Sequence, residues 1–564
     1  MTVEKKWSVL DADKSLINNL STSLNVSDII AKLLVLRGVH TFEEAKLFFR
    51  PELEHLHDPF LMKDMSKAVQ RIEKAIANNE NILIYGDYDV DGTTSVAMVY
   101  QFLYKTTKNI RYYIPCRYTE GYGVSFKAIE YAYENNVSLI IALDCGIRAV
   151  SQINYANKKK IDFIICDHHT PGEHLPEAIA ILNPKQKKCN YPFSDLSACG
   201  VGFKLIHAFS IKNEISFSEV IKYLDLVVIS ISADIVPMNG ENRVLAFYGL
   251  KQINTKPSSG IKALIGLTNK KNELNVSDIL FGIAPRINAA GRIDHARKAV
   301  EVLIEQDYIK AKQLAQLIDL NNIKRKELEA ETTREAIEML DKTKNTNVVF
   351  HSNWHKGVIG IVASRLIESH YRPTIVFAEK DGLLTGSARS INDFNLYESL
   401  LKCSYLFEKF GGHKYAAGLT LKKENLEQFI IEFEKIVSEK ITLEQLQPNI
   451  AIDMEINIDE IDYKLFRIID QLSPFGPTNK RPIFLSKGVS DSGFAKQVGD
   501  MKNHLKLNIK KSEKVIPAIG FNMGRYLQSI SRVNDFDICY SIDQNEWNGR
   551  KELQIQILDL KINS

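Results

Sequence analysis

The chain has 564 residues, of which 45% are hydrophobic and 25% are charged, and its formal net charge is +3. This composition is typical of a globular protein with several domains. The small net charge excludes a strong overall basic field, although it allows a local basic groove. The seven cysteines lack paired spacing, which favours a reducing cytoplasm over a disulfide framework.

Neither membrane insertion nor secretion is indicated by the distribution of apolar residues. No apolar run is long enough to span a bilayer, and the opening residues lack the apolar core of a signal peptide. We therefore expect a cytoplasmic protein that does not bind a membrane. The apolar stretch 224–236 is expected to be a core helix or strand.

The first third of the chain predicts a parallel sheet. Residues 1–60 contain short helical patterns, and from Asn81 onward short β-branched runs alternate with amphipathic stretches. Strands are expected at 81–86, 110–115, 138–146 and 162–169, and helices at 93–105 and 126–136. This alternation is typical of a mostly parallel sheet with helices on both faces.

The rest of the chain predicts three further regions. Helical periodicity dominates 260–345, a second α/β region starts near residue 347, and a Lys/Glu-rich helix covers 421–446. Short strands follow, which indicate a small all-β barrel or sandwich, and a five-stranded barrel is the preferred arrangement. The fold class is therefore α/β, with these expected domains: an N-terminal helical segment (1–60), a catalytic domain (61–255), a helical connector (256–345), a substrate-binding α/β domain (346–446) and a nucleic-acid-binding barrel (447–564).

A run of alternating carboxylates follows the first expected strand. Asp87, Asp89 and Asp91 stand in the segment GDYDVDGTT. On an extended chain, alternate side chains point the same way, so their oxygens can converge on a cation; without a cation, the three anions would raise one another's pKa. The alternatives are a solvated turn or a calcium loop. The calcium loop is disfavoured because Met98 stands where its bidentate glutamate would be.

Acidic and histidine side chains also end later apolar runs. Asp144 ends SLIIALDCG, Asp167–His169 end DFIICDHH, and Asp234 follows another apolar run. Because parallel strands present their carboxyl ends at one edge, we expect these side chains to lie together. Mixed Asp and His ligation suits Mn²⁺ or Mg²⁺, and two such ions could support hydrolysis of a phosphodiester or phosphoanhydride.

An ordered set of motifs gives the chain a family resemblance. With DHH at 167–169, GDYDVDG before it and LDCG between them, the sequence resembles the DHH phosphoesterase superfamily, in particular its branch of single-stranded-DNA exonucleases. The resemblance extends over essentially the whole chain. The supporting segments are IPCRYTEGYGV, YLDLVVISISADIVPMNGENRVL, APRINAAGRI, WHKGVIGIVASRL, GSARSINDFNL, FGGHKYAAGLTL, PFGPTNKRPIF and NEWNGRKELQIQILDL.

The resemblance implies roles for individual residues. The implied metal ligands are Asp87, Asp89, Asp91, Asp144, His168 and Asp234. The implied catalytic residues are His169, beside the scissile phosphate, with Asp144 and His168. The implied binders of the DNA 5′ end or its phosphates are Arg117, Arg292, Ser387, Arg389 and His413, with Arg286 as a competitor of Arg292. The barrel aromatics are either stacking platforms or core residues: Phe484, Phe521, Tyr540 and Trp547.

The function implied by the resemblance is metal-dependent 5′→3′ hydrolysis of single-stranded DNA to mononucleotides, in DNA repair and recombination. The implied cofactors are two Mn²⁺ or Mg²⁺ ions. The implied partners are single-stranded DNA, a single-stranded-DNA-binding protein and a RecQ-type helicase, and the chain is expected to be a monomer. One alternative is a short-oligonucleotide or cyclic-dinucleotide phosphodiesterase of the same superfamily, which would typically lack the barrel. Another is an inactive scaffold protein, which would be expected to lose metal-site carboxylates.

Overall fold

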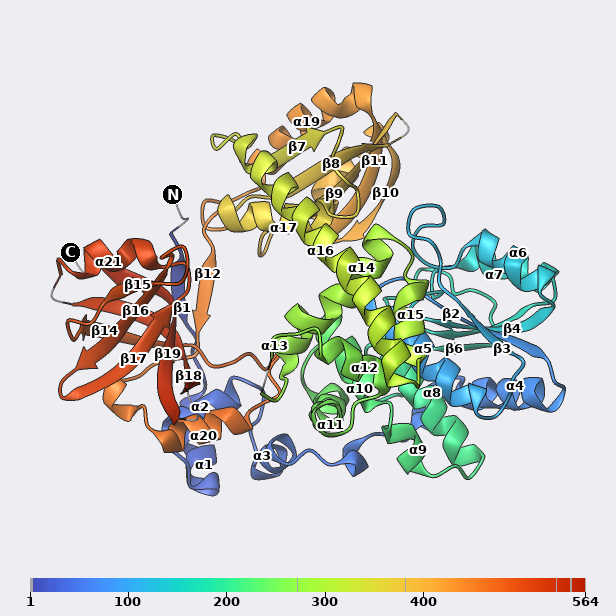
Figure 1. Ribbon diagram of the computed structural model, residues 1–564, viewed down its shortest axis with the longest axis horizontal. Helices are drawn as coiled ribbons and strands as arrows, with labels where there is room; N and C mark the ends of the chain where they lie inside the picture. The colour runs from blue at the N-terminus through green and yellow to red at the C-terminus, as the bar shows by residue number, and fades with distance from the viewer. Residues whose placement is uncertain (1–3, 271, 381, 534, 548–549, 563–564) are drawn as a thin grey trace. The chain divides into compact units, whose positions relative to one another are not determined.

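The elements of the chain divide between two compact units. A computed structural model describes residues 4–270, 272–380, 382–533, 535–547 and 550–562 (Figure 1). The sheet unit comprises residues 51–327 and 474–479. The barrel unit comprises residues 1–50, 328–473 and 480–564. The domain boundaries expected from the sequence remain predictions.

A parallel sheet forms the centre of the sheet unit. In spatial order its strands are β3 (Ile110–Tyr113), β2 (Asn81–Gly86), β4 (Val137–Leu143), β5 (Asp162–Cys166) and β6 (Ala180–Leu182). Every neighbouring pair is parallel, which confirms the predicted α/β class. The short strand β6 was not predicted from the sequence.

Helices cover both faces of this sheet. Ile82 and Ile84 of β2 lie in one core, whereas Leu83 and Tyr85 lie in a second core on the opposite face. Such full burial explains why these strands read as continuous apolar runs. The first core includes α4 (Met65–Ala77), α5 (Val90–Tyr104), α8 (Ala198–Lys212) and α10 (Leu224–Ala233). The second core includes α6 (Phe126–Glu134) and α7 (Val150–Lys158).

The helices that follow pack into the first of these cores. Ile261, Ile287 and Val300 belong to the same apolar cluster as the sheet residues. Helix α16 (Tyr308–Glu338) is the longest helix of the region in which helical periodicity was predicted. Helix α11 (Gly240–Thr255) precedes that region. The helices between α11 and α16 are α12 (Ser259–Ile265), α13 (Val276–Asp278), the π-helical turn η3 (Ile279–Ile283), α14 (Ala284–Ile293) and α15 (Arg297–Ile304).

The barrel unit contains a second, mixed sheet. In spatial order its strands are β10 (Phe407–His413), β11 (Ala416–Lys422), β9 (Leu383–Arg389), β8 (Thr374–Lys380) and β7 (Asn347–His351). The pair β7–β8 is parallel and the other pairs are antiparallel. Side chains of α17 (Ile359–Ser369) form a core with one face, and those of α18 (Leu396–Lys402) and α19 (Leu426–Ser438) form a core with the other.

The last part of the barrel unit is a closed five-stranded barrel, as the sequence predicts (Figure 1). Its strands are β14 (Phe484–Asp491), β16 (His504–Lys511), β17 (Lys514–Gly520), β18 (Phe536–Trp547) and β19 (Arg550–Ile562). Closure results because β14 pairs with both β18 and β16. Phe484 and Tyr540 are fully buried in the barrel, so these two aromatic side chains are core residues. Phe521 is 54% exposed, and the side chain of Trp547 lies outside the described residues.

The N-terminal segment is held against the barrel. Its strand β1 (Lys6–Val9) pairs in parallel with β12 (Asn449–Ile452), and the Trp7 indole N–H donates to Asp559 at 2.9 Å. The expectation of helices alone in residues 1–60 therefore missed one strand, because a four-residue strand gains its hydrogen bonds from a partner more than 400 residues away. The helices are α1 (Lys14–Leu24), α2 (Asp28–Val35) and α3 (Phe42–Phe49).

Candidate metal centre

The alternating carboxylates lie where β2 gives way to α5. Asp87 follows the end of β2 and is 1% exposed. Asp89 caps α5 by accepting the Gly92 N–H at 3.0 Å. Asp91 already lies in the first helical turn. The three carboxylates are therefore not alternate side chains of one extended segment, which corrects the expectation from the sequence. The capping preference of Asp89 starts the helix here and turns Asp91 away from that line.

Asp91 is fixed by the start of a second helix. Its carboxylate accepts the backbone N–H groups of Ala198 and Cys199 at 2.8 and 2.9 Å and the Ser230 hydroxyl at 2.7 Å. Ala198 and Cys199 form the first turn of α8, where N–H groups lack helical partners and favour an anion. These bonds hold Asp91 in a defined position without using all of its acceptor capacity.

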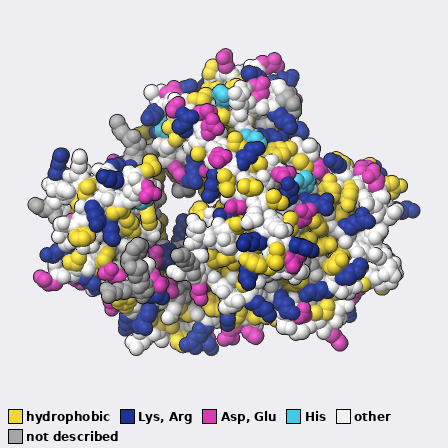
Figure 2. Space-filling view, viewed as in Figure 1, with side chains coloured by type: hydrophobic (Ala, Val, Ile, Leu, Met, Phe, Trp, Pro, Cys, Tyr) yellow, Lys and Arg dark blue, Asp and Glu magenta, His cyan; other side chains and the backbone are white. Residues whose placement is uncertain are grey.

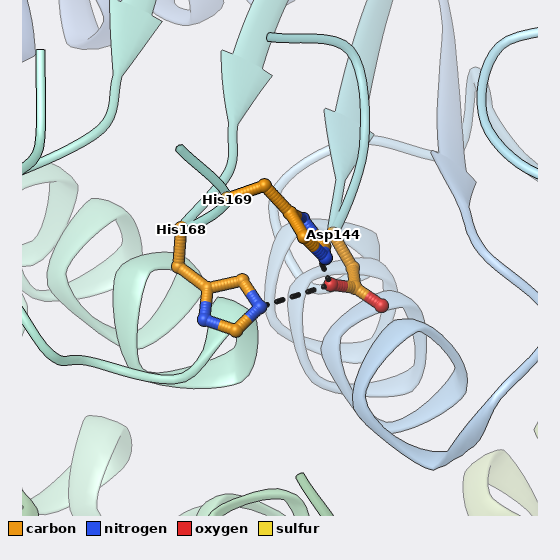
Figure 3. A group of neighbouring side chains, drawn as sticks. All are labelled: Asp144, His168 and His169. Carbon is orange, nitrogen blue, oxygen red and sulfur yellow. Dashed lines mark ion pairs between the residues drawn. The ribbon is translucent and has the colours of Figure 1, made fainter. Parts of the chain in front are cut away.

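Asp144 and His168 come from the ends of the adjacent strands β4 and β5 (Figure 3). His168 Nδ1 lies 3.1 Å from the Leu196 carbonyl oxygen. A carbonyl only accepts, so Nδ1 carries the proton and Nε2 keeps a free lone pair. That lone pair faces carboxylates: Nε2 lies 3.4 Å from Asp144 Oδ1, 3.6 Å from Asp234 Oδ2 and 3.7 Å from Asp91 Oδ2.

Two buried atoms at this point are left without hydrogen bonds. Within the described residues, Asp144 Oδ1 and His168 Nε2 are both buried and both lack a hydrogen-bond partner. Asp144 also has a left-handed backbone, with φ of 62°. Orphaned acceptors and backbone strain both cost stability, and they are retained where a ligand needs the groups. Two unpaired acceptors 3.4 Å apart fit a cation between or beside them.

The ligand atoms cluster in three overlapping groups within the described residues. In each group, the atoms lie within 4.8 Å of one another. The groups are Asp87–Asp89–Asp144, Asp91–His168–Asp234 and Asp144–His168–His169. All six ligands suggested by the sequence therefore converge at the carboxyl edge of the sheet. Oxygen and imidazole donors of this kind suit Mn²⁺ or Mg²⁺.

The electrostatics of the cluster favour a bound cation. Burial, followed by repulsion from Asp89, Asp91 and Asp87, raises the pKa of Asp144 well above its ordinary value. Burial and then Asp91 raise the pKa of Asp234 to about 8. Burial also lowers the pKa of His168. Carboxylates that resist ionisation in the protein alone become good ligands when a divalent charge is nearby.

His169 lies beside the cluster and is held on both sides of its ring. Its Nδ1 lies 2.7 Å from Asp167 Oδ1, and its Nε2 lies 3.0 Å from the Tyr122 hydroxyl (Figure 3 shows the ring beside Asp144). Burial alone would raise the pKa of Asp167, but hydrogen bonds from His169 and from the backbone of His169 and Ile147 lower it to about 2. Asp167 is therefore ionised and orients His169. Sequence reasoning gave no separate role to Asp167 or Tyr122, because their partners are set by the fold.

Two of the three predicted phosphate-binding arginines of the sheet unit lie beside the metal-binding loop. The Arg117 guanidinium lies 5.1 Å over the ring of Tyr88, which stands between Asp87 and Asp89. The Arg292 guanidinium lies close enough to Tyr88 to oppose the rise of the Tyr88 pKa, and the Arg292 backbone carbonyl accepts the Tyr118 hydroxyl. Arg286 instead makes an internal clamp, since its guanidinium donates to Asp319 and to the carbonyls of Gly282 and Leu267. These contacts favour Arg292 over Arg286 for phosphate binding.

The remaining predicted phosphate ligands belong to the barrel unit. Ser387 and Arg389 project from the same face of β9, and Arg389 Nη1 donates to Ser387 Oγ at 3.2 Å. A Cβ on Gly360, in the first turn of α17, would lie 2.9 Å from Ser387 Oγ and 3.1 Å from Arg389 Nη2. A guanidinium, a hydroxyl and a helix N-terminus thus meet, a combination that favours an anion. His413 is exposed at the end of β10.

Comparison with known families places the chain in a class. The model of the DHH family N-terminal domain matches residues 81–231, that of the DHHA1 domain matches 325–439 and that of the RecJ OB domain matches 452–559. The domains matched, in this order along the chain, are those of a DHH-family protein, and the DHH model covers the strands at whose carboxyl ends Asp87, Asp144 and His168 lie. Among the described residues, no helix combines the length and apolar composition that a membrane span needs.

Full-length relatives identify the particular family. The single-stranded-DNA-specific exonuclease RecJ of Bacillus subtilis (strain 168) is 38% identical over 99% of this chain and 71% of that protein. RecJ of Escherichia coli (strain K12) is 31% identical over 94% of this chain and 95% of that protein. The crystal structure of RecJ in complex with Mn²⁺ from Thermus thermophilus covers 99% of this chain and 80% of that chain, with a TM-score of 0.87 and 25% identity. The chain belongs to the RecJ family.

Proposed function

We propose that the protein is a metal-dependent exonuclease that hydrolyses phosphodiester bonds of single-stranded DNA. The observation that carries the proposal is the pair of buried, unpartnered atoms, Asp144 Oδ1 and His168 Nε2, inside a cluster of carboxylates. Full-length similarity to proteins named as single-stranded-DNA-specific exonucleases supports the substrate. A RecJ crystal structure that contains Mn²⁺ supports the cofactor.

Two neighbouring sets of ligands would hold two ions. One set is Asp87, Asp89 and Asp144, and the other is Asp91, His168 and Asp234. Asp144 and His168 lie 3.4 Å apart, so Asp144 is also within reach of the second set. Bound Mn²⁺ or Mg²⁺ would supply an activated water and charge neutralisation at the phosphate.

His169 would act on the substrate from the side of this centre. Asp167 Oδ1 lies 2.7 Å from Nδ1 of the ring and the Tyr122 hydroxyl lies 3.0 Å from Nε2, so both nitrogens are held and the imidazole, when protonated, would place positive charge beside the scissile phosphate. Arg117 and Arg292 would bind phosphate oxygens, since both arginines flank Tyr88 and guanidinium groups pair well with phosphates. The chain would thus position the strand with arginines and hydrolyse it beside His169.

The 5′→3′ polarity, the mononucleotide products and the role in repair and recombination are part of the same proposal. They depend on a binding site for the 5′ end. The cluster of Ser387, Arg389 and the start of α17 has the chemistry of such a site, and His413 would add a donor. We retain the expected boundaries at 60, 255, 345 and 446, a monomeric chain and a cytoplasmic location. A single-stranded-DNA-binding protein and a RecQ-type helicase remain the proposed partners.

The barrel would hold the strand through one side of its surface. Acidic and basic side chains are interspersed on the face seen in Figure 2, and the net charge of the chain is only +3, so the proposal looks to individual groups of the barrel. Lys496 and Lys506 stand directly opposite each other on β15 (Lys496–Val498) and β16. Like charges in this position destabilise a sheet, so their presence favours an anionic ligand. Phe494, 53% exposed, lies next to Lys496 and offers a stacking surface.

This barrel argues against the alternative phosphodiesterases. A short-oligonucleotide or cyclic-dinucleotide substrate needs no second binding site for a long strand. Replacing both lysines (Lys496→Gln with Lys506→Gln) should therefore weaken long-strand binding about tenfold and lower the salt dependence, while hydrolysis of very short substrates is retained. The matched control is Lys464→Gln, an exposed lysine on α20 (Tyr463–Gln471). Equal affinity of the double variant and the control variant for long strands would show that the surface around Lys496 and Lys506 does not bind the strand.

The function itself is tested with end-labelled strands. Single-stranded DNA labelled at the 5′ or the 3′ end is incubated with the protein, with Mn²⁺ or with a chelator. We expect the 5′ label to be released first, as a mononucleotide, and only with the metal. Early release of the 3′ label would overturn the polarity, and metal-independent release would overturn the mechanism. A duplex of the same sequence is the control for strand selectivity.

A further inference from the structure

The loop 114–124, between β3 and α6, contacts the metal centre through Tyr122, Gly123 and Arg117. The Tyr122 hydroxyl lies 3.0 Å from His169 Nε2 and 3.3 Å from the backbone oxygen of Asp144. Arg117, in the same loop, lies over Tyr88 of the metal-binding segment. The conformation of this loop therefore sets the position of two groups that face the reaction site.

Glu120 is the internal brace of this loop. Its carboxylate accepts the Cys116 N–H at 2.9 Å, the Tyr113 hydroxyl at 3.0 Å and the Ser125 hydroxyl at 2.6 Å. Tyr113 ends β3 and Ser125 is the N-cap of α6, so one carboxylate joins the loop to both of its flanking elements. Hydrogen bonds from neutral donors to a carboxylate are among the stronger ones in proteins.

Tyr122 depends on this brace because its own backbone is flanked by hinges. Gly121 and Gly123 have φ of +84° and +81°, and a Cβ on either would meet nothing within 4 Å. Glycine is needed at both positions because other residues adopt this left-handed backbone conformation only with strain. Neither glycine has a side chain that could pack against the protein and hold the loop in place. Gly123 is anchored by the Tyr85 hydroxyl, which donates to its carbonyl at 2.6 Å. Glu120 supplies the anchor on the other side of Tyr122.

We propose that Glu120 is a positioning residue of the exonuclease: its carboxylate holds the loop so that the Tyr122 hydroxyl fixes the His169 ring. The proposal rests on the proposed function, in which His169 acts on the substrate. Glu120 itself touches neither the metal ligands nor the proposed phosphate-binding side chains in any contact found among the described residues. Asp167 holds one ring nitrogen and Tyr122 the other, so loss of the brace leaves His169 tethered on one side only.

The test is a double-mutant cycle on the full chain with single-stranded DNA and Mn²⁺. Glu120→Ala should lower kcat about 10- to 100-fold, the loss expected when a reacting group is displaced by about 1 Å. The Mn²⁺ concentration for half-maximal activity should stay within about twofold, because no metal ligand is removed. Any rise in KM through Arg117, which lies in the same loop, should be smaller than the fall in kcat. Glu120→Gln should be intermediate, since an amide can accept from Cys116 and bond to both hydroxyls.

Coupling to Tyr122 separates positioning from general loosening. Tyr122→Phe should lower kcat, and Glu120→Ala combined with Tyr122→Phe should be no slower than the slower single variant. Multiplied effects, or wild-type kcat in Glu120→Ala, would overturn the proposal. If Glu120→Ala does not fold, Glu120→Gln takes its place in the cycle and the same outcomes decide.

The control variant is Glu134→Gln, an exposed glutamate at the end of α6, which should match the wild type. The two proposals fail in different ways. An unmodified protein without metal-dependent nucleotide release contradicts the proposed function. An active unmodified protein with unaffected Glu120 variants contradicts only the role of Glu120.

Discussion

Two buried groups of charged side chains lie in the sheet unit, and they differ in how their polar atoms are satisfied. Lys204 and Glu241 form an ion pair at 2.5 Å, with side chains 0% and 1% exposed. Lys204 also donates to the His57 carbonyl at 2.9 Å, and Glu241 accepts the His57 N–H and the Tyr191 hydroxyl. This pair is neutral overall and hydrogen-bonded at both ends.

The metal centre shows the opposite arrangement. It gathers carboxylates of like charge, and it leaves Asp144 Oδ1 and His168 Nε2 without hydrogen-bond partners. A protein can bury a satisfied ion pair for structure alone, whereas unsatisfied like charges lower stability until a ligand arrives. Burial of charged side chains does not by itself indicate a functional site. Buried charges that no counter-charge or hydrogen bond within the protein satisfies do indicate one.

The largest expected effect comes from removing the shared ligand of the metal centre. Asp144→Asn should lower the rate of nucleotide release at least about 10³-fold, because the asparagine cannot supply the anionic ligand that belongs to one ion set and lies within reach of the other. The melting temperature in chelator should not fall, since asparagine resembles the protonated aspartate. Single-turnover kinetics and thermal melts measure the two quantities. Full activity would remove Asp144 from the mechanism.

Disrupting the Lys204–Glu241 pair should lower stability and leave activity unchanged, the reverse of the effect at Asp144. Lys204→Met leaves Glu241 buried without its counter-charge and should lower the free energy of unfolding by about 3–5 kcal/mol. Urea unfolding measures the loss, and activity per folded molecule should be unchanged. Adding Glu241→Leu should recover part of the stability, because both charges are then gone. A loss below about 1 kcal/mol would show that the buried pair contributes no more to stability than an exposed ion pair does.

The stabilisation of the folded chain by Mn²⁺ should depend on the carboxylates of the metal centre and not on the Lys204–Glu241 pair. At 100 times its dissociation constant, Mn²⁺ should raise the free energy of unfolding by about 2.7 kcal/mol. Lys204→Met should keep this increment and Asp144→Asn should lose most of it, as measured by urea unfolding with Mn²⁺ and with chelator. An equal increment in both variants would place the stabilising metal elsewhere in the chain.

The difference between these clusters also marks what the sequence could predict. The strands and the residues at their carboxyl ends follow from apolar runs, so the convergence of Asp87, Asp144 and His168 was predictable from local pattern and the edge rule for parallel sheets. The closed barrel was also predictable from local pattern, since successive apolar runs at strand periodicity fill the last part of the chain.

Pairings between distant residues were not predictable in this way. The contact of Asp91 with Ala198 and the Lys204–Glu241 pair depend on which helix packs beside which, and the anchoring of Tyr122 depends on which loops meet at the sheet edge. Periodicity says that a helix has a buried face, but it does not say which partner meets that face. The sequence therefore identified the ligands without the groups that orient them.

The smallest expected effect is a pH dependence confined to the metal-free centre. Asp234 has a pKa of about 8 in the folded chain against an ordinary 3.8, so between these values the folded state binds more protons than the unfolded state. The free energy of unfolding in chelator should therefore fall as pH rises through this range. The Asp234 side chain is 31% exposed, so screening limits the change to about 1 kcal/mol between pH 6 and 8.

Saturating Mn²⁺ should reverse this slope, because the ions bind carboxylates in their deprotonated form. Asp234→Asn should flatten the slope in chelator, and Lys204→Met should leave it in place despite the lower stability. Thermal melts at pH 6, 7 and 8 in both conditions measure it. Stability that rises with pH in chelator would mean that protein groups already compensate the carboxylates. The metal centre would then be a satisfied cluster like that of Lys204 and Glu241, and its orphaned atoms would no longer argue for a cation.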